Sequence, residues 1–183
     1  ALLGALYSLV INGANQLVNP FLQVKFSIGY ATAGFVTTIW GIGVVIGSLT
    51  GGRLIDRLGH LRSVIMAIVL TILAVIAMVG IFSLPIAWVV VAVFGVAFGY
   101  YETVYFALSM EVTDPRIAAS MFSILMAIAN VGTGIGLAAS GAFVEAVGYH
   151  WAFVFLAAIN LLAIPLLPVI FRKNVRVQEI PAR

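Results

Sequence analysis

Glu102 is the only acidic residue inside a long apolar segment of this sequence. An ionised carboxylate at membrane depth is costly, so an acid in such a segment is by default a candidate for function. The chemistry open to it is the uptake and release of a proton, and we take Glu102 as the candidate proton-coupling residue. The alternative is a structural acid that hydrogen-bonds to Tyr105, one helical turn further on, or to a nearby helix, or that is wetted near the end of its segment.

A second group of polar residues occupies the first apolar segment, where spacings of three and four residues place them on one face of a helix. This stripe consists of Ser8, Asn12, Asn15, Gln16 and Asn19. An amide that faces lipid without a partner is strongly unfavourable, so we expect the stripe to face protein or water. Amides donate and accept hydrogen bonds, which suits hydroxyl, amide or carboxylate groups of a solute; the alternative is hydrogen bonding between helices. The candidate solute-binding residues are Asn12, Asn15, Gln16, Asn19, Tyr101, Glu102, Tyr105 and Asn130.

The composition places these residues in a membrane protein. Of the 183 residues, 63% are hydrophobic and 8% are charged, whereas a soluble domain is roughly 45–50% apolar and about 25% charged. A spanning helix needs about 20 apolar residues, and the sequence predicts six. We expect helices at roughly 2–18, 31–51, 63–82, 86–110, 117–144 and 151–171, with Asn19-Pro20 ending the first and two prolines kinking the last.

Several function classes are disfavoured by what the sequence lacks. Without cysteine, disulfides and thiolate metal sites are excluded. The net charge of +3 is scattered over the expected loops, which does not favour a nucleic-acid partner. No phosphate-cradling Gly-Lys-Ser loop and no pair of acids at catalytic spacing is present. We therefore expect no enzymatic activity, no cofactor and no metal.

Two helical faces are built from small residues at intervals of four. The first has Gly43, Gly47 and Gly51, and the second has Gly132, Gly136 and Ser140. Such faces allow helices to approach closely in membranes. We take as packing glycines Gly43, Gly47, Gly132 and Gly136.

The charged segment that follows the first glycine face is expected to form a short turn, residues 52–59. It resembles the signature loop of the major facilitator superfamily, G-x-x-x-D-R/K-x-G-R/K-R/K, at Gly52, Asp56, Arg57 and Gly59. His60 and Leu61 depart from that pattern, and Arg62 carries a positive charge one place late. The resemblance implies a conformational latch made by Gly52, Asp56, Arg57, Gly59 and Arg62; the alternative is an ordinary basic turn.

When the sequence is shifted by 89 residues, the glycines of the first small-residue face and of the signature segment, together with Asp56, align with matching residues of a second copy. Gly43, Gly47, Gly52, Asp56 and Gly59 fall on Gly132, Gly136, Gly141, Glu145 and Gly148. Because each copy has three helices, the second must be inverted, as in the repeats of secondary transporters. We expect a six-helix transmembrane bundle over residues 1–171, with repeats at about 1–82 and 86–171, followed by a tail at 172–183.

The basic residues set the expected orientation. One side of the bundle carries eight of them, and the other carries only Lys25. The eight are Arg53, Arg57, Arg62, Arg116, Arg172, Lys173, Arg176 and Arg183. The positive-inside rule therefore places the signature segment and the tail in the cytoplasm. We expect an integral protein of a bacterial or archaeal plasma membrane.

The resemblance also implies a twelve-helix carrier of two six-helix halves. We expect this chain to be the C-terminal half, with the N-terminal half missing; a natural six-helix protein that dimerises is the alternative. In that fold the first and fourth helices of each half line the central cavity, and the third and sixth face lipid. The polar residues agree, because they gather in the first and fourth expected helices, and the third and sixth are the barest.

The function that the resemblance implies is secondary active transport of a small-molecule substrate by alternating access. Whether this transport is coupled to protons is left open. Within carriers, a multidrug/proton antiporter and a muropeptide-type permease both fit; the second rests on a faint similarity between residues 110 and 136. The alternatives from other classes are a non-transporting receptor or subunit of the same fold and a membrane-embedded enzyme. The expected partners are the lipid bilayer, the substrate and the missing half.

Overall fold

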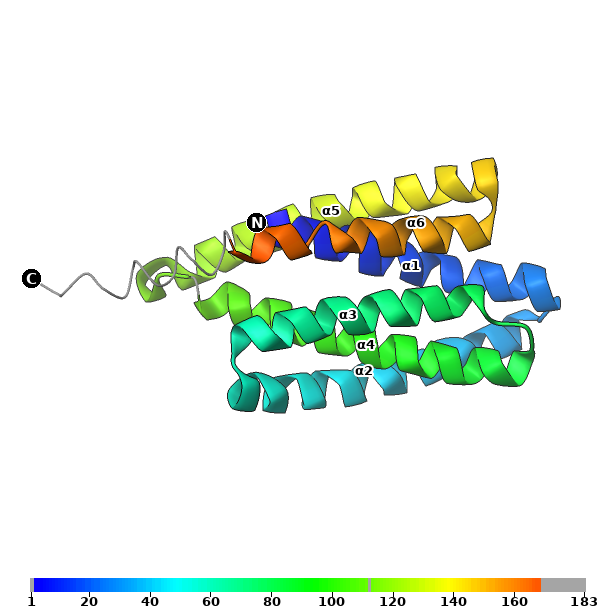
Figure 1. Ribbon diagram of the computed structural model, residues 1–183, viewed down its shortest axis with the longest axis horizontal. Coiled ribbons are helices and arrows are strands. Elements are labelled where there is room, and N and C mark those ends of the chain that lie inside the picture. Colours follow the sequence, from blue (N-terminus) through cyan, green and yellow to red (C-terminus); the bar gives the residue numbers. More distant parts are fainter. Residues whose placement is uncertain (1, 112, 169–183) are drawn as a thin grey trace, which may run out of the picture.

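Six α-helices that alternate in direction make up the described part of the computed structural model, which covers residues 2–111 and 113–168. They are α1 (Leu2–Phe26), α2 (Tyr30–Leu58), α3 (His60–Val79), α4 (Leu84–Glu111), α5 (Ala118–Val147) and α6 (Tyr149–Leu161), with 3-10 turns at Pro115–Ile117 and Ile164–Leu166. The α2–α3 and α4–α5 connections lie at one end of the bundle with the start of α1, and the other three connections lie at the opposite end (Figure 1). The predicted tail, 172–183, lies outside the described residues.

Five of these helical segments are long and apolar enough to cross a membrane, which confirms the prediction of an all-α membrane protein. They are Tyr30–Leu58, His60–Val79, Leu84–Glu111, Ala118–Val147 and Tyr149–Leu166. Helix α1 is not among them, since its amide residues lower its hydropathy. It nevertheless lies inside the bundle, with almost half of its residues buried.

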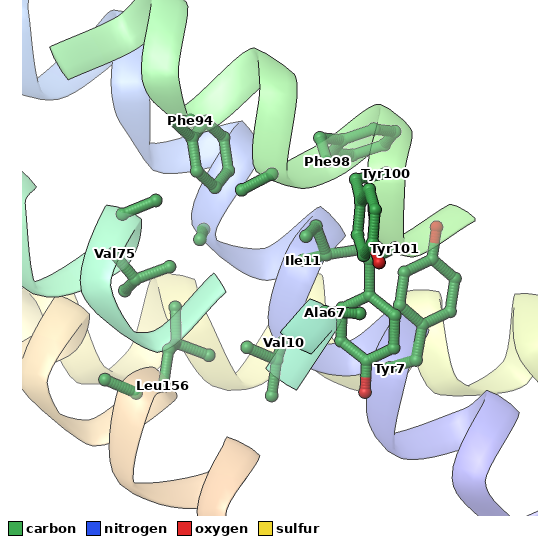
Figure 2. Close-up of a cluster of buried hydrophobic side chains, with 14 of the residues drawn as sticks. Tyr7, Val10, Ile11, Ala67, Val75, Phe94, Phe98, Tyr100, Tyr101 and Leu156 are labelled. Carbon is green, nitrogen blue, oxygen red and sulfur yellow. The ribbon is translucent and has the colours of Figure 1, made fainter. Parts of the chain in front are cut away.

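The helices form two groups of three that interleave in the sequence. Helix α1 packs against α5 and α6, and α4 packs against α2 and α3 (Figure 1). The two groups meet chiefly where α3 contacts α6, with smaller contacts of α1 to α2 and α4. Figure 2 shows the apolar core at this junction, where Val10 and Ile11 of α1, Val75 of α3, Phe94 of α4 and Leu156 of α6 converge.

The closest helix contacts are made by the predicted packing glycines. A Cβ atom at Gly47 would overlap the carbonyl oxygen of Val96 on α4, and one at Gly136 would overlap the carbonyl oxygen of Leu9 on α1. Gly43 and Gly132 lie one turn earlier against Ala92 and Ala5 in the same manner. Helix α4 returns the contact with its own Gly95 and Gly99, which face Trp40 and Val44. Helix pairs α2–α4 and α1–α5 are therefore packed backbone to backbone.

Two glycines turn the chain tightly between consecutive helices. Gly59 between α2 and α3 has φ +79°, and Gly148 between α5 and α6 has φ +83°. Each donates its N–H to the residue four positions earlier, Ile55 or Val144, at 2.9 Å. Because a side chain is strained at such φ angles, glycine is needed at both turns.

Three predicted helix boundaries are wrong. Helix α1 does not end at Asn19-Pro20 but continues through Pro20 to Phe26. The residues that were expected to form a charged turn, 52–58, are the last two turns of α2, and only Gly59 leaves the helix. Most residues between Gly52 and Gly59 are good helix formers, so α2 ends only at Gly59, where φ becomes positive. Helix α6 ends at Leu161, and the Pro165 segment continues as a 3-10 turn.

Helices α3 and α6 carry the fewest polar side chains. Asn160 of α6 is buried and donates its Nδ2–H to the Ile68 carbonyl oxygen of α3 at 3.4 Å. Helix α3 exposes an apolar face instead, formed by Ile65, Met66, Val69, Leu73 and Ile76. In a membrane protein such a face suits contact with lipid.

Candidate functional site

Two pockets flank α1, one toward each end of the bundle. The smaller, which we call the Glu102 pocket, has a volume of about 200 Å³ and lies between α1, α4 and α5. Its lining is Tyr7, Ser8, Asn12, Glu102, Tyr105, Phe106, Met126, Ala129, Asn130 and Thr133. The larger, the amide pocket, has a volume of about 550 Å³. Its polar lining is Asn15, Gln16, Asn19, Gln23, Thr37, Trp40 and Ser140.

The Glu102 pocket joins a half-buried carboxyl group to a set of aromatic rings. The Tyr7 and Tyr105 rings are stacked with centroids 5.3 Å apart, and Tyr105 lies 6.0 Å from Phe106. Helix α5 completes the wall with the amide of Asn130 and the hydroxyl of Thr133. Sequence positions far apart therefore bring one acid, three rings and several uncharged polar groups together in an otherwise apolar bundle.

Tyr105 does not hydrogen-bond to Glu102, contrary to the structural alternative considered from the sequence. Its hydroxyl donates instead to the Leu125 carbonyl oxygen of α5, at 3.4 Å. The hydroxyl lies over Gly4 of α1, where any Cβ atom would overlap it. A tyrosine side chain in a helix points toward the N-terminus of that helix. The Tyr105 side chain accordingly reaches across to α1 and α5, and the Glu102 carboxyl group remains open to the pocket.

The amide stripe of α1 divides between two roles. Asn12 donates its Nδ2–H to Thr133 Oγ1 at 3.2 Å and to the Ser8 carbonyl oxygen at 3.2 Å. Asn19 donates to Thr37 Oγ1 of α2 at 2.9 Å. These two amides therefore connect α1 to α5 and α2, as the alternative of interhelical hydrogen bonding requires.

Asn15 and Gln16 differ from these two amides. Their side chains make no hydrogen bond within the described residues, and both line the amide pocket. Free amide donors and acceptors in a pocket of this size can bind polar groups of a solute.

Three polar residues of the amide pocket escaped the sequence reasoning: Gln23, Thr37 and Trp40. Gln23 continues the stripe one turn beyond Asn19, but the helix was expected to end at Pro20. The stripe spacing was the signal that could have found it. Thr37 and Trp40 belong to α2, and no polar periodicity in that helix points to them.

Tyr101 lines neither pocket, although the sequence made it a candidate. Its side chain is 1% exposed and packs on the Tyr7 ring, with centroids 4.5 Å apart (Figure 2). It belongs to the core behind the Glu102 pocket, where it supports the Tyr7 ring.

The signature segment ends α2 at the opposite end of the bundle from the amide pocket. Asp56 and Arg57 are exposed there, and neither makes an ion pair within the described residues. A contact that the sequence reasoning missed lies beside them: His60 Nδ1 is 3.1 Å from Glu111 Oε2 at the end of α4, which is an ion pair when His60 is protonated. The departure from the signature pattern at His60 was the only signal for it.

No group of three or more His, Cys, Asp or Glu residues gathers at metal-binding spacing within the described part of the chain. The chemistry of the two pockets is thus that of a carboxyl group, amides, hydroxyls and aromatic rings. Such groups bind and orient a solute and exchange a proton, which requires no covalent step.

One comparison with known proteins identifies a family. The family model of the Major Facilitator Superfamily matches residues 1–182 of the chain. No curated protein matches the sequence.

Proposed function

This chain belongs to the major facilitator superfamily of membrane transporters, and we propose that it serves secondary active transport of a small solute by alternating access, coupled to protons at Glu102. The observation that carries the proposal is the convergence of Glu102, Asn130 and the α1 amides on pockets inside an apolar bundle. Polar groups at membrane depth are costly, so their placement around a cavity favours a solute path. Membership of a family of transporters favours transport over the enzyme alternative.

We further propose that the bundle consists of two inverted three-helix repeats. The Gly132–Ala5 and Gly136–Leu9 contacts of α5 with α1 correspond to the Gly43–Ala92 and Gly47–Val96 contacts of α2 with α4. The glycine turns at Gly59 and Gly148 have matching φ angles and matching N–H bonds. Equivalent contacts at a nearly constant offset along the chain are what a repeat produces.

The orientation follows from the placement of charge. Arg53, Arg57, Arg62 and Arg116 gather at the end of the bundle that holds the α2–α3 and α4–α5 connections, and Lys25 lies near the other end (Figure 1). By the positive-inside rule the first end faces the cytoplasm. The exposed Asp56 and Arg57 are then free to contact a second six-helix half, which is the latch role that the family resemblance implies.

The test uses the intact protein in liposomes that enclose a pH-sensitive dye. Pools of small solutes are added outside, and a solute that moves with or against protons changes the internal pH. We expect at least one pool to give a signal, and Glu102→Gln to abolish it while thermal unfolding shows that the variant is folded. The matched control is Glu145→Gln, which removes an exposed acid at the end of α5. Binding without any flux in the wild type would favour the receptor alternative.

A further inference from the structure

The Glu102 pocket has an acidic group without a basic partner. Helices α4 and α5 contain no Lys or Arg, and the only basic residue of α1 is Lys25 in its last turn. Within the described residues the single ion pair joins His60 to Glu111, away from the pocket. An ionised Glu102 therefore gives the pocket a negative charge, which disfavours anionic solutes and favours cationic ones.

The walls of the pocket suit the same kind of solute. The rings of Tyr7, Tyr105 and Phe106 line the same pocket as the carboxyl group, with neighbouring ring centroids 5.3 and 6.0 Å apart. Aromatic faces attract ammonium groups, and such rings recognise quaternary ammonium ligands. The volume of about 200 Å³ holds a group of several heavy atoms, since a water molecule occupies roughly 30 Å³ of liquid.

Some of the uncharged polar groups of the pocket are engaged in hydrogen bonds between or within helices. The Asn12 amide N–H and the Thr133 hydroxyl are already engaged with Thr133 Oγ1 and the Ala129 carbonyl oxygen. Tyr105 donates to Leu125. Tyr7, Ser8 and Asn130 also bring uncharged donors to the pocket, but none of them carries a positive charge that would offset the Glu102 carboxylate, which is unpaired within the described residues.

From the unpaired acidic group and the aromatic rings, we infer that the Glu102 pocket binds the ammonium group of an organic cation. This inference names the substrate class for the proposed transport site. It also accounts for coupling, since the carboxyl group holds either a proton or the cation and each displaces the other. The titratable groups that face Glu102 are Tyr7 of α1 and Tyr105 of α4, and the α5 wall contributes the non-titrating Asn130 and Thr133.

The test is equilibrium binding to the intact protein in detergent, with choline as the probe. Its uncharged carbon isostere, 3,3-dimethyl-1-butanol, has the same shape without the charge. We expect choline to bind at least about tenfold more tightly than the isostere, a difference of about 1.4 kcal/mol, because the carboxylate and the aromatic rings attract only the cation. We expect Glu102→Gln to abolish this preference, with Glu145→Gln as the unaffected control. Choline binding should weaken on acidification in the wild type and be insensitive to pH in Glu102→Gln.

Two variants separate the rings from the fold. Tyr105→Phe keeps the ring and should retain choline binding, whereas Tyr105→Leu should weaken it, with thermal unfolding showing that both variants are folded. The inference is overturned if choline shows no saturable binding, if the isostere binds equally well, or if Glu102→Gln binds choline like the wild type. Solute-driven proton flux without choline binding would leave the transport function standing and remove this inference. Choline binding without any flux would support this inference and remove the transport function.

Discussion

Gly47→Ala is expected to destabilise the bundle, because it adds one carbon atom at the tightest contact of α2 with α4. The new Cβ would overlap the Val96 carbonyl oxygen and lie 2.8 Å from its carbon and 2.9 Å from the Tyr100 nitrogen. Non-bonded carbon atoms prefer separations of about 3.5–4.0 Å. All three atoms belong to the backbone of α4, so no side chain can rotate away, and the two helices must separate by about 1 Å.

The magnitude follows from a comparison with Gly41→Ala in the same helix. A Cβ at Gly41 meets no atom within 4 Å, so this change adds only the helix propensity of alanine, about 1 kcal/mol. Gly47→Ala gains the same propensity but also overpacks a close contact, which costs about 1–3 kcal/mol. The difference between the two variants isolates the contact, and it should equal about 1–3 kcal/mol.

The assay is thermal unfolding of the two variants in the same detergent at one scan rate, since unfolding of such proteins is often irreversible. For a chain of this size about 1 kcal/mol shifts the midpoint by about 2–4 °C, so Gly47→Ala should unfold about 2–12 °C below Gly41→Ala. Gly136→Ala and Gly134→Ala form the equivalent pair in α5, where Gly134 is likewise open. Equal midpoints within both pairs would refute close helix packing at these glycines.

Three further predictions concern charged and amide side chains. Asp56→Asn or Arg57→Ala should reduce solute flux at equal protein level without lowering the unfolding midpoint, since both residues are exposed; wild-type flux in both would contradict the latch. His60→Ala removes a partly exposed ion pair with Glu111 and should cost less than about 1 kcal/mol; a double-mutant cycle of unfolding midpoints that shows no coupling would argue against the pair. Asn160→Leu should be neutral or stabilising, because the Asn160 Oδ1 atom is buried without a partner among the described residues; a clear fall in the midpoint would show that its 3.4 Å bond to α3 matters more.

Much of the fold could be predicted from local pattern. Composition and run length predicted an all-α membrane protein, and the charged motif predicted the family; both are confirmed. The boundary at Pro20 was wrong because the cost of a proline in a helix depends on its surroundings. Pro20 leaves the Gln16 carbonyl oxygen without its usual N–H partner, but both residues line the amide pocket, where another donor can reach that oxygen.

The candidate site was partly visible in the sequence, because helical spacing shows which residues share a face. It could not show which neighbouring helix meets that face. Asn12 and Asn15 look alike in sequence, yet Asn12 bonds to Thr133, whereas Asn15 has no hydrogen bond within the described residues and lines the other pocket. The same limit hid Trp40, whose place in the amide pocket depends on how α2 packs beside α1.

The glycine contacts and the polar pockets are parts of one arrangement. In lipid no hydrophobic force draws helices together, so close packing at small residues sets their separation. Along α1, the contact of Gly13 with Ser140 comes after Asn12, the last α1 residue that lines the Glu102 pocket, and before Asn15, the first that lines the amide pocket. This contact of α1 with α5 therefore lies between the two pockets, and the Leu9–Gly136 contact one turn earlier brings Asn12 within reach of Thr133. A motion that exposed first one pocket and then the other would have to act on this contact, which links the packing glycines to transport as well as to stability.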